Sequence, residues 1–230
     1  RVSKSNTLDP KMPRDLNSRC QQWGSMDVVE RDTLIGDLAT YWENEGFPYP
    51  VPKPEELSVV MSLQEDHVIQ GGVIKNRHAG QSSCHAFSRH IFEATSYGSP
   101  LSPRALFDSP KDLRKALQLI LDKGDVPSGA TLRSSLRFLR RSGVYNFRPT
   151  AAKVLVDRFC RPGGVVYDPC AGYGGRLFGA LLSKSRPTYL ACEPQTETYT
   201  RLHDLRDWMG SYLPGLPSRA SFHNVPDEDF

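Results

Sequence analysis

Apolar residues recur every three or four positions over much of the chain, which is the period of an amphipathic helix. The pattern is clear over residues 26–45 and again over 108–122, where Ser109 and Pro110 have the residue types of a helix cap and a first helical position. Shorter helical patterns follow at 55–70, 131–142, 151–159, 177–182 and 203–212. Residues 1–24 show no sustained period, so we expect an arm or an ordered extension on the surface there.

Three short runs instead combine apolar, aromatic and β-branched residues, as buried strands do. They lie at 165–167, 188–192 and 220–225, and a loop of small residues at 168–175 follows the first of them. A strand, loop, helix and second strand at this spacing are typical of a parallel βαβ unit. The fold class predicted is therefore α/β, with a mainly helical region over residues 1–142 and the sheet within 143–230.

The loop at 168–175 has the composition of a ligand-binding turn. Gly172, Gly174 and Gly175 allow the backbone to approach a ligand closely, and Glu193 ends the next strand, where a carboxylate could accept both hydroxyls of a ribose. A dinucleotide-binding fingerprint would need a further glycine near Leu177, and the sequence has none there. The negative charge of Asp168 suits an ammonium group better than a pyrophosphate. The ligand that matches these residues best is a nucleoside carrying a cationic amino acid.

Three motifs in this region resemble those of S-adenosylmethionine-dependent amino-methyltransferases. The loop Asp168-Pro-Cys-Ala-Gly-Tyr-Gly-Gly175 resembles the first motif of that family, and Ala191-Cys-Glu-Pro194 resembles its ribose-binding second motif. Asn146-Phe-Arg-Pro-Thr150 is similar to the motif that closes over the methionine end of the cofactor. The resemblance covers roughly 144–230 and implies a Rossmann-like methyltransferase sheet, incomplete in this chain, with S-adenosyl-L-methionine as cofactor.

The resemblance also implies a set of cofactor contacts. Asp168 would hold the methionine ammonium, Glu193 the ribose hydroxyls, and Pro194 would lie near the adenine. The full set implied is Phe147, Arg148, Pro149, Thr150, Asp168, Pro169, Cys170, Ala171, Gly172, Tyr173, Gly174, Glu193, Pro194 and Asn224. The implied reaction is methyl transfer to an exocyclic amino group of a DNA base, with this chain supplying the cofactor-binding half of the enzyme.

No catalytic residue is assigned, because the tetrapeptide with which this family activates the target amino group (Asp/Asn/Ser-Pro-Pro-Tyr/Phe) is absent from the sequence. Residues 165–230 are also fewer than the roughly 100–150 of a typical domain. We therefore expect a split or truncated enzyme, whose sheet is completed by a chain continuation, a second polypeptide or another copy. Pro169-Cys170 echoes the nucleophile of cytosine-methylating enzymes, but within a cofactor loop Cys170 is better explained by packing.

Two alternatives to this function remain open at this level. One is a non-catalytic subunit that keeps a methyltransferase-like fold as a nucleic-acid-binding or assembly module. The other is an RNA or small-molecule methyltransferase, which would share the same cofactor loop.

Charge points to a nucleic-acid partner only through its distribution. The chain as a whole carries a net charge of +3, whereas residues 101–148 contain ten Lys/Arg and four Asp/Glu. On the helix expected at 131–142 we predict phosphate contacts from Arg133, Arg137, Arg140 and Arg141.

Cysteine usage and hydropathy exclude several other classes. The five cysteines are scattered and form no Cys-x-x-Cys pair, which argues against a disulfide framework or a four-cysteine zinc site. Cys84 and His85 lie between His78 and His90, but this spacing matches no usual zinc pattern, so no metal site is predicted. No apolar run approaches the length of a membrane span. A cytoplasmic protein with no membrane partner is expected.

Overall fold

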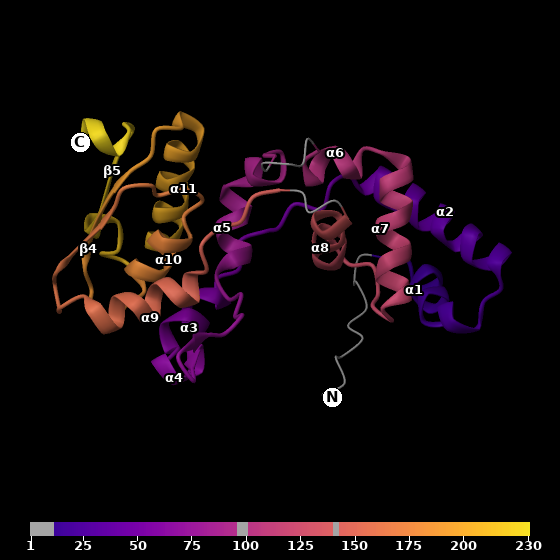
Figure 1. Cartoon of the computed structure of the whole chain (residues 1–230), viewed down its shortest axis with the longest axis horizontal. Coiled ribbons are helices and arrows are strands. Elements are labelled where there is room, and N and C mark those ends of the chain that lie inside the picture. Colours follow the sequence, from indigo (N-terminus) through magenta and orange to yellow (C-terminus); the bar gives the residue numbers. More distant parts are fainter. Residues whose placement is uncertain (1–11, 96–100, 140–142) are drawn as a thin grey trace. The chain divides into compact units, whose positions relative to one another are not determined.

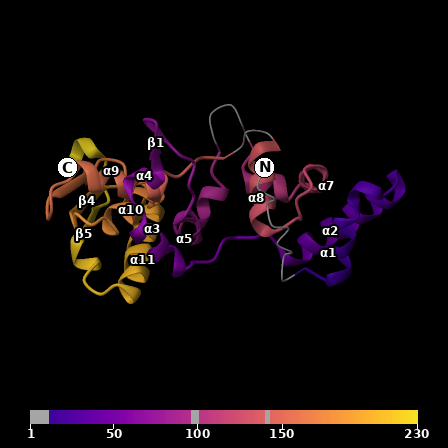
Figure 2. The ribbon, with the colours of Figure 1, turned by 90° about the horizontal axis from the view of Figure 1, so that it is seen from below.

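The computed structural model describes residues 12–95, 101–139 and 143–230, which form two compact units (Figures 1 and 2). The first unit lies within Arg1–Tyr49 and His90–Val144, and the second comprises Pro50–Arg89 and Tyr145–Phe230. The domain boundary predicted at residue 142 lies close to the boundary between the units at residues 144 and 145. The prediction places residues 50–89 in the N-terminal region, whereas in the structure they fold with the C-terminal unit.

The described residues of the first unit form helices and the loops between them, with no strand. Its elements are α1 (Arg14–Gln21), η1 (Trp23–Ser25), α2 (Val28–Glu45), α6 (Pro103–Phe107), α7 (Pro110–Asp122) and α8 (Gly129–Leu139), with η2 (Arg89–Phe92) where the chain enters from the second unit. Helix α7 packs against both α2 and α8, and fully buried leucines from the three helices form the core. These are Leu34, Leu38, Leu113, Leu117, Leu132 and Leu136.

Local sequence explains where these helices begin. Asp27 and Glu30 form a capping box at the start of α2, in which each side chain accepts a hydrogen bond from the other's backbone N–H. Ser109 caps α7 and Pro110 is its first residue, so both sequence assignments are confirmed. Of the arm or ordered extension expected over residues 1–24, residues 1–11 lie outside the described part of the chain. The remainder is ordered as α1 and the start of η1, in which Leu16, Cys20 and Trp23 are buried.

The second unit holds a three-stranded parallel sheet, which confirms the α/β class. Its strands are β3 (Val165–Asp168), β4 (Thr188–Cys192) and β5 (Ala220–His223), in the order β3-β4-β5. Its helices are α3 (Glu55–Ser62), α4 (Glu65–Val68), α5 (Gln81–Phe87), α9 (Pro149–Phe159), α10 (Gly175–Leu181) and α11 (Thr196–Tyr212), with η3 (Pro217–Arg219) and η4 (Asp227–Asp229) near the C-terminus. Asp168 lies opposite Ala191 across β3 and β4, so the C-terminal ends of these strands are level.

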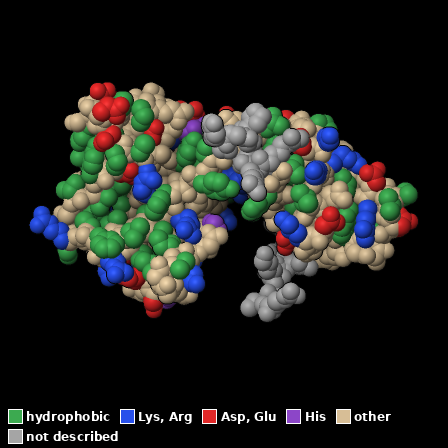
Figure 3. Space-filling model, viewed as in Figure 1, with side chains coloured by type: hydrophobic (Ala, Val, Ile, Leu, Met, Phe, Trp, Pro, Cys, Tyr) green, Lys and Arg blue, Asp and Glu red, His purple; other side chains and the backbone are tan. Residues whose placement is uncertain are grey.

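One face of this sheet is buried, and the other is covered only in part among the described residues. On that second face the Phe230 ring stacks on the Tyr167 ring, with 5.6 Å between their centres, and Cys192 is buried. Tyr189, Ala191 and Phe222 point into a core with α10 and α11, whereas Val165 and Tyr167 are 65% and 44% exposed. Parallel sheets are normally covered on both faces. Figure 3 shows hydrophobic side chains gathered on the surface of this unit. Asp227, Glu228 and Asp229 are consecutive acidic residues in η4.

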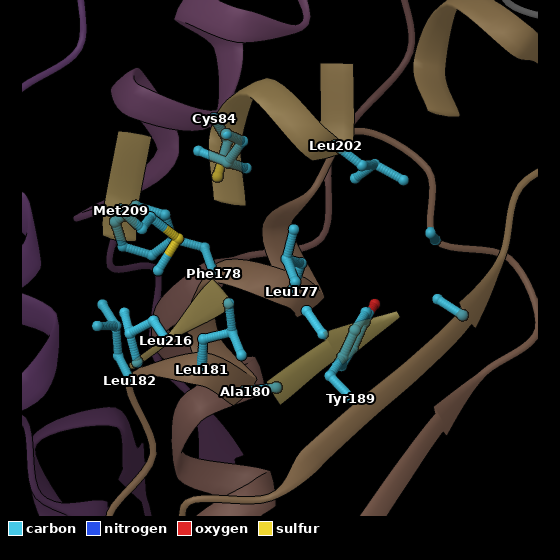
Figure 4. Packing of buried hydrophobic residues seen from close by; sticks show 14 of the residues in the cluster. Cys84, Leu177, Phe178, Ala180, Leu181, Leu182, Tyr189, Leu202, Met209 and Leu216 are labelled. Carbon is cyan, nitrogen blue, oxygen red and sulfur yellow. The ribbon is translucent and has the colours of Figure 1, made fainter. Parts of the chain in front are cut away.

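The core of the second unit draws on both of its segments. Figure 4 shows Phe178, Leu181 and Met209 together with Cys84, which comes from α5 and is fully buried. Leu57 and Val60 of α3 belong to the same cluster. Residues 50–89 therefore supply part of the hydrophobic core on which the sheet rests.

The helix expected over residues 55–70 is interrupted. Leu63 adopts an extended conformation that ends α3, and Gln64 then caps the short α4. A hairpin follows, formed by β1 (Ile69–Gln70) and β2 (Val73–Ile74). None of the described helices combines the length and the apolar character needed to cross a membrane.

Candidate functional site

Asn146, which lies just before α9, makes two hydrogen bonds to the loop between β3 and α10. The Nδ2 of Asn146 donates to the carbonyl of Tyr173 (3.0 Å), and its Oδ1 accepts from the backbone N–H of Gly175 (3.2 Å). Asn146 is 9% exposed, so both hydrogen bonds are shielded from water. The predicted first motif and the predicted methionine-end motif are therefore in direct contact.

The same loop is also hydrogen-bonded to the C-terminal end of β4 and to Glu193, which follows it. The backbone N–H of Ala171 donates to the carbonyl of Cys192 (2.9 Å), and that of Gly172 donates to Oε2 of Glu193 (2.8 Å). The other carboxylate oxygen of Glu193 accepts from the backbone N–H of Gln195 (3.1 Å). The loop thus crosses the ends of both strands, and Glu193 lies beside its glycine turn.

The three glycines of the loop have different roles. Gly172 has a φ of +56°, and a Cβ built on it would meet only the carbonyl of Cys170, at 3.7 Å. A Cβ on Gly174 would lie 2.6 Å from the side chain of Leu205, and one on Gly175 would lie 1.9 Å from the carbonyl of Phe147. Gly174 and Gly175 therefore serve internal packing, and Gly172 is the glycine that leaves open space for a ligand.

Asp168 is held by groups of the protein itself. One oxygen accepts from the backbone N–H of Cys170 (3.2 Å), and the other accepts from Nε of Arg176 (2.7 Å) and from the hydroxyl of Tyr189. Burial, followed by the charge of Asp168, raises the pKa of Tyr189 well above its usual value, so Tyr189 remains a proton donor. The side chain of Asp168 is 5% exposed.

Arg176 is the more accessible member of this ion pair, with a side chain 36% exposed. It also donates to the carbonyl of Cys170, and its guanidinium carbon lies 5.6 Å from the centre of the Phe147 ring. Although burial alone lowers it, the hydrogen bond and charge of Asp168 raise the pKa of Arg176, which therefore stays charged.

A pocket of about 410 Å³ adjoins this ion pair. Its floor and sides are mostly apolar and come from α9, β3, α10 and β4, and Asp168 and Arg176 are its charged lining residues. Of the residues implied by the family resemblance, it is lined by Phe147, Asp168, Pro169 and Cys170. A ligand in this pocket would meet one charged end and an apolar interior.

The residues expected at the nucleoside end lie beyond the strand ends. Pro194 and Asn224 are exposed, and Nδ2 of Asn224 donates to the carbonyls of Glu193 (2.8 Å) and Pro194 (3.2 Å). Asn224 therefore ties the end of β5 to the turn after β4. The structure brings Gly172, Glu193, Pro194 and Asn224 together.

Of the residues expected at the methionine end, one lines the pocket and three pack against other parts of the same unit. Phe147 is 39% exposed and lines the pocket, but Thr150 is fully buried and donates to the carbonyl of Arg77 (3.0 Å). Pro149 is buried, and Arg148 donates to the carbonyl of Lys75 (3.0 Å) and to Asn76 (3.3 Å). These three side chains hold α9 against residues 75–80, and Phe147 is the one that faces open space.

Of the arginines predicted to contact phosphates, the two that the structure describes contact other residues of the first unit. Arg133 donates to the carbonyl of Pro48, and burial together with the charge of Arg137 lowers the pKa of Arg133 to about 10. The Arg137 guanidinium lies 5.0 Å from the centre of the Phe92 ring. Neither side chain is fully exposed, and Arg140 and Arg141 lie outside the described residues.

Sequence reasoning did not assign roles to Asn146, Arg176 and Tyr189. Asn146 was visible as the residue before Phe147, and Arg176 as the one charge directly after the glycines. Tyr189 carried no signal, since an aromatic residue within a strand is ordinarily core. Among the described residues, no group of three or more histidine, cysteine or acidic side chains is placed to hold a metal ion.

Comparison with protein-family models, with curated proteins and with solved structures found no match to this chain.

Proposed function

We propose that this chain binds S-adenosyl-L-methionine at the β3–α10 loop and serves as the cofactor-binding half of a methyltransferase. The observation that carries the proposal is the contact between Gly172 and Glu193, which sets an open glycine turn beside a carboxylate at the ends of two adjacent parallel strands. Ligands of α/β sheets bind in this position, beyond the carboxyl ends of the strands.

The residues present fit the nucleoside part of this cofactor. Glu193 is 7% exposed, but each of its oxygens accepts one backbone hydrogen bond and keeps a lone pair that can accept a ribose hydroxyl. Gly172 leaves space for the sugar, and Pro194 offers an exposed apolar surface for the base. The backbone hydrogen bonds of Glu193 fix its carboxylate before the ligand arrives, which lowers the entropic cost of binding.

When bound, the sulfonium of this cofactor supplies an electrophilic methyl group. The contribution of the chain is to bind, orient and desolvate, because an in-line displacement needs the two reactants aligned and water excluded. The apolar lining of the pocket suits the exclusion of water. Groups that activate the acceptor amine are proposed to come from the segment that completes the sheet beside β3, whether a chain continuation, a second polypeptide or another copy.

A DNA base remains the acceptor that we propose, on the basis of the family resemblance and the basic residues of 101–148. The inward positions of Arg133 and Arg137 weaken the phosphate-binding argument for that helix. An RNA or small-molecule acceptor is the alternative, and methyl transfer to DNA compared with RNA distinguishes them.

A non-catalytic subunit is the second candidate function. The specific observation in its favour is that the acceptor-activating tetrapeptide is absent from the sequence. Such a subunit would retain the fold and the surface charge but would show no methyl transfer with any partner.

Titration calorimetry with S-adenosylmethionine tests the proposal directly. The wild-type chain is expected to bind, and Glu193→Gln is expected to weaken binding by about 10- to 100-fold, the value of a charge-assisted hydrogen bond. Glu197→Gln is the matched control, since Glu197 is an exposed carboxylate four positions away at the start of α11. Absence of binding, or an equal loss in both variants, would contradict the proposed site.

A further inference from the structure

The charged end of the pocket presents a cation to a ligand more readily than an anion. Asp168 is 5% exposed and accepts hydrogen bonds from Cys170, Arg176 and Tyr189. The side chain of Arg176 is 36% exposed in the same ion pair. The family resemblance assigns Asp168 to an ammonium group, but its carboxylate is already neutralised and enclosed by the protein's own donors.

The orientation of Arg176 is fixed on three sides. Its Nε is paired with Asp168 at 2.7 Å, its Nη2 donates to the carbonyl of Cys170, and its guanidinium lies over the Phe147 ring. Within the described part of the chain, Nη1 makes no hydrogen bond. A guanidinium immobilised in this way loses little conformational entropy on binding, and its free nitrogen is suited to a planar anion such as a carboxylate.

We propose that Arg176 binds the α-carboxylate of the ligand's amino acid part, and that Asp168 is a positioning residue that holds Arg176 in place. This inference rests on the proposed function, since it assigns a role within the same site. It makes Arg176 a specificity-determining residue: the chain selects nucleosides that carry an amino acid and discriminates against those that have lost the carboxylate.

The test compares two ligands that differ only in that group, S-adenosylhomocysteine and its decarboxylated analogue, by titration calorimetry. The wild-type chain is expected to bind the decarboxylated analogue about 10- to 100-fold more weakly, because the charge-assisted hydrogen bond is lost. The Arg176→Gln variant is expected to bind S-adenosylhomocysteine more weakly by a similar factor, while its affinity for the decarboxylated analogue changes little. The preference for the ligand that carries the carboxylate should therefore disappear.

Arg158→Gln is the matched control. Arg158 forms an ion pair with Glu65 of the same length, 2.7 Å, in the same unit, but it does not line the pocket. Its removal is expected to preserve the preference between the two ligands. Arg176→Lys keeps the charge without the planar fork, so it should retain part of the preference and serves as a second variant if Arg176→Gln does not fold.

The possible failures are distinguishable. If the wild-type chain binds both nucleosides equally, or if Arg176→Gln weakens both by the same factor, the carboxylate assignment is wrong while the nucleoside site stands. If the wild-type chain binds neither, the proposed function fails and this inference with it.

Discussion

Gly175 shows how a single missing methyl group can determine the shape of a binding loop. The backbone at this position passes so close to Phe147 and Asn146 that any side chain would displace the segment entering α9. Phe147 and Arg176 both border the pocket, so the glycine controls the site indirectly, through the approach of two backbones. Sequence reading treated this glycine as part of a ligand-binding turn, because spacing alone cannot tell internal packing from ligand contact.

Gly175→Ala is therefore expected to lower the free energy of unfolding by about 3 kcal/mol, the upper end of the usual cost of overpacking. The added Cβ would lie 1.9 Å from the carbonyl oxygen of Phe147 and 2.7 Å from Oδ1 of Asn146. Urea unfolding followed by circular dichroism measures the loss.

Gly163→Ala provides the comparison within the same unit. Gly163 has a φ of +68° and no atom within 4 Å of a Cβ built on it, so only backbone strain applies. The expected cost is about 1 kcal/mol. Equal losses in the two variants would show that the close approach at Gly175 relaxes freely.

At the scale of elements, the sequence predicted the strands and most of the helices of the second unit well. Strands β3 and β4, at 165–168 and 188–192, match the short apolar runs from which strands were predicted at 165–167 and 188–192. Helix α5 was missed, since Gln81-Ser-Ser-Cys-His-Ala-Phe87 has little helical pattern. Its stability comes from packing against α10 and α11, which no local window contains.

In the candidate site, too, the features that depend on local sequence could be predicted, and those that depend on packing could not. The loop, Glu193 and their positions at the ends of adjacent strands could be predicted, because they depend on order along the chain. The pairing of Asp168 with Arg176 and Tyr189 could not, since which groups surround a carboxylate depends on the three-dimensional fold. The role expected of Asp168, as an ammonium acceptor, remains a prediction, and its enclosure by three donors is the finding that bears on it.

Helix α9 contains a buried ion pair whose loss should be costly. Lys153 and Asp157 are 2.7 Å apart with side chains 3% and 10% exposed, and Asp157 also accepts from Ser183 and the backbone of Lys184. Asp157→Ala would leave the buried ammonium of Lys153 bonded to the carbonyl of Leu63 but without its charged partner, and we expect it to destabilise the protein by about 3–5 kcal/mol. Thermal or urea unfolding gives the value.

The exposed pair Arg201–Asp204 is the control for this experiment, with side chains 46% and 43% exposed. Asp204→Ala is expected to change stability by less than about 1 kcal/mol, because water and salt screen such pairs. A similar small effect for Asp157→Ala would mean that Lys153 finds another partner or reaches solvent.

For the molecule as a whole, the incompletely covered face of the sheet predicts association. Val165 and Tyr167 expose apolar surface on β3, which has a hydrogen-bonded neighbour on one side only among the described strands. Exposed edges and faces of this kind pair readily with other chains. The isolated chain is therefore expected to self-associate in sedimentation velocity as its concentration rises, and Val165→Lys should reduce that association.

Phe159→Lys separates this effect from general hydrophobicity. Phe159 is 76% exposed and is the last residue of α9, so it is not part of the sheet. If Phe159→Lys reduces association as much as Val165→Lys does, the sheet is not the surface responsible.

The interleaving of the two units sets an order of events for a newly made chain. Leu57, Val60 and Cys84 leave the ribosome before residues 90–144, yet the core they join is built from residues 145–230. At about 5–20 residues per second, several seconds of translation separate the two halves of that core. During this interval the first unit can close while these side chains remain in water, so the nascent segment at 50–89 is the natural target for a chaperone.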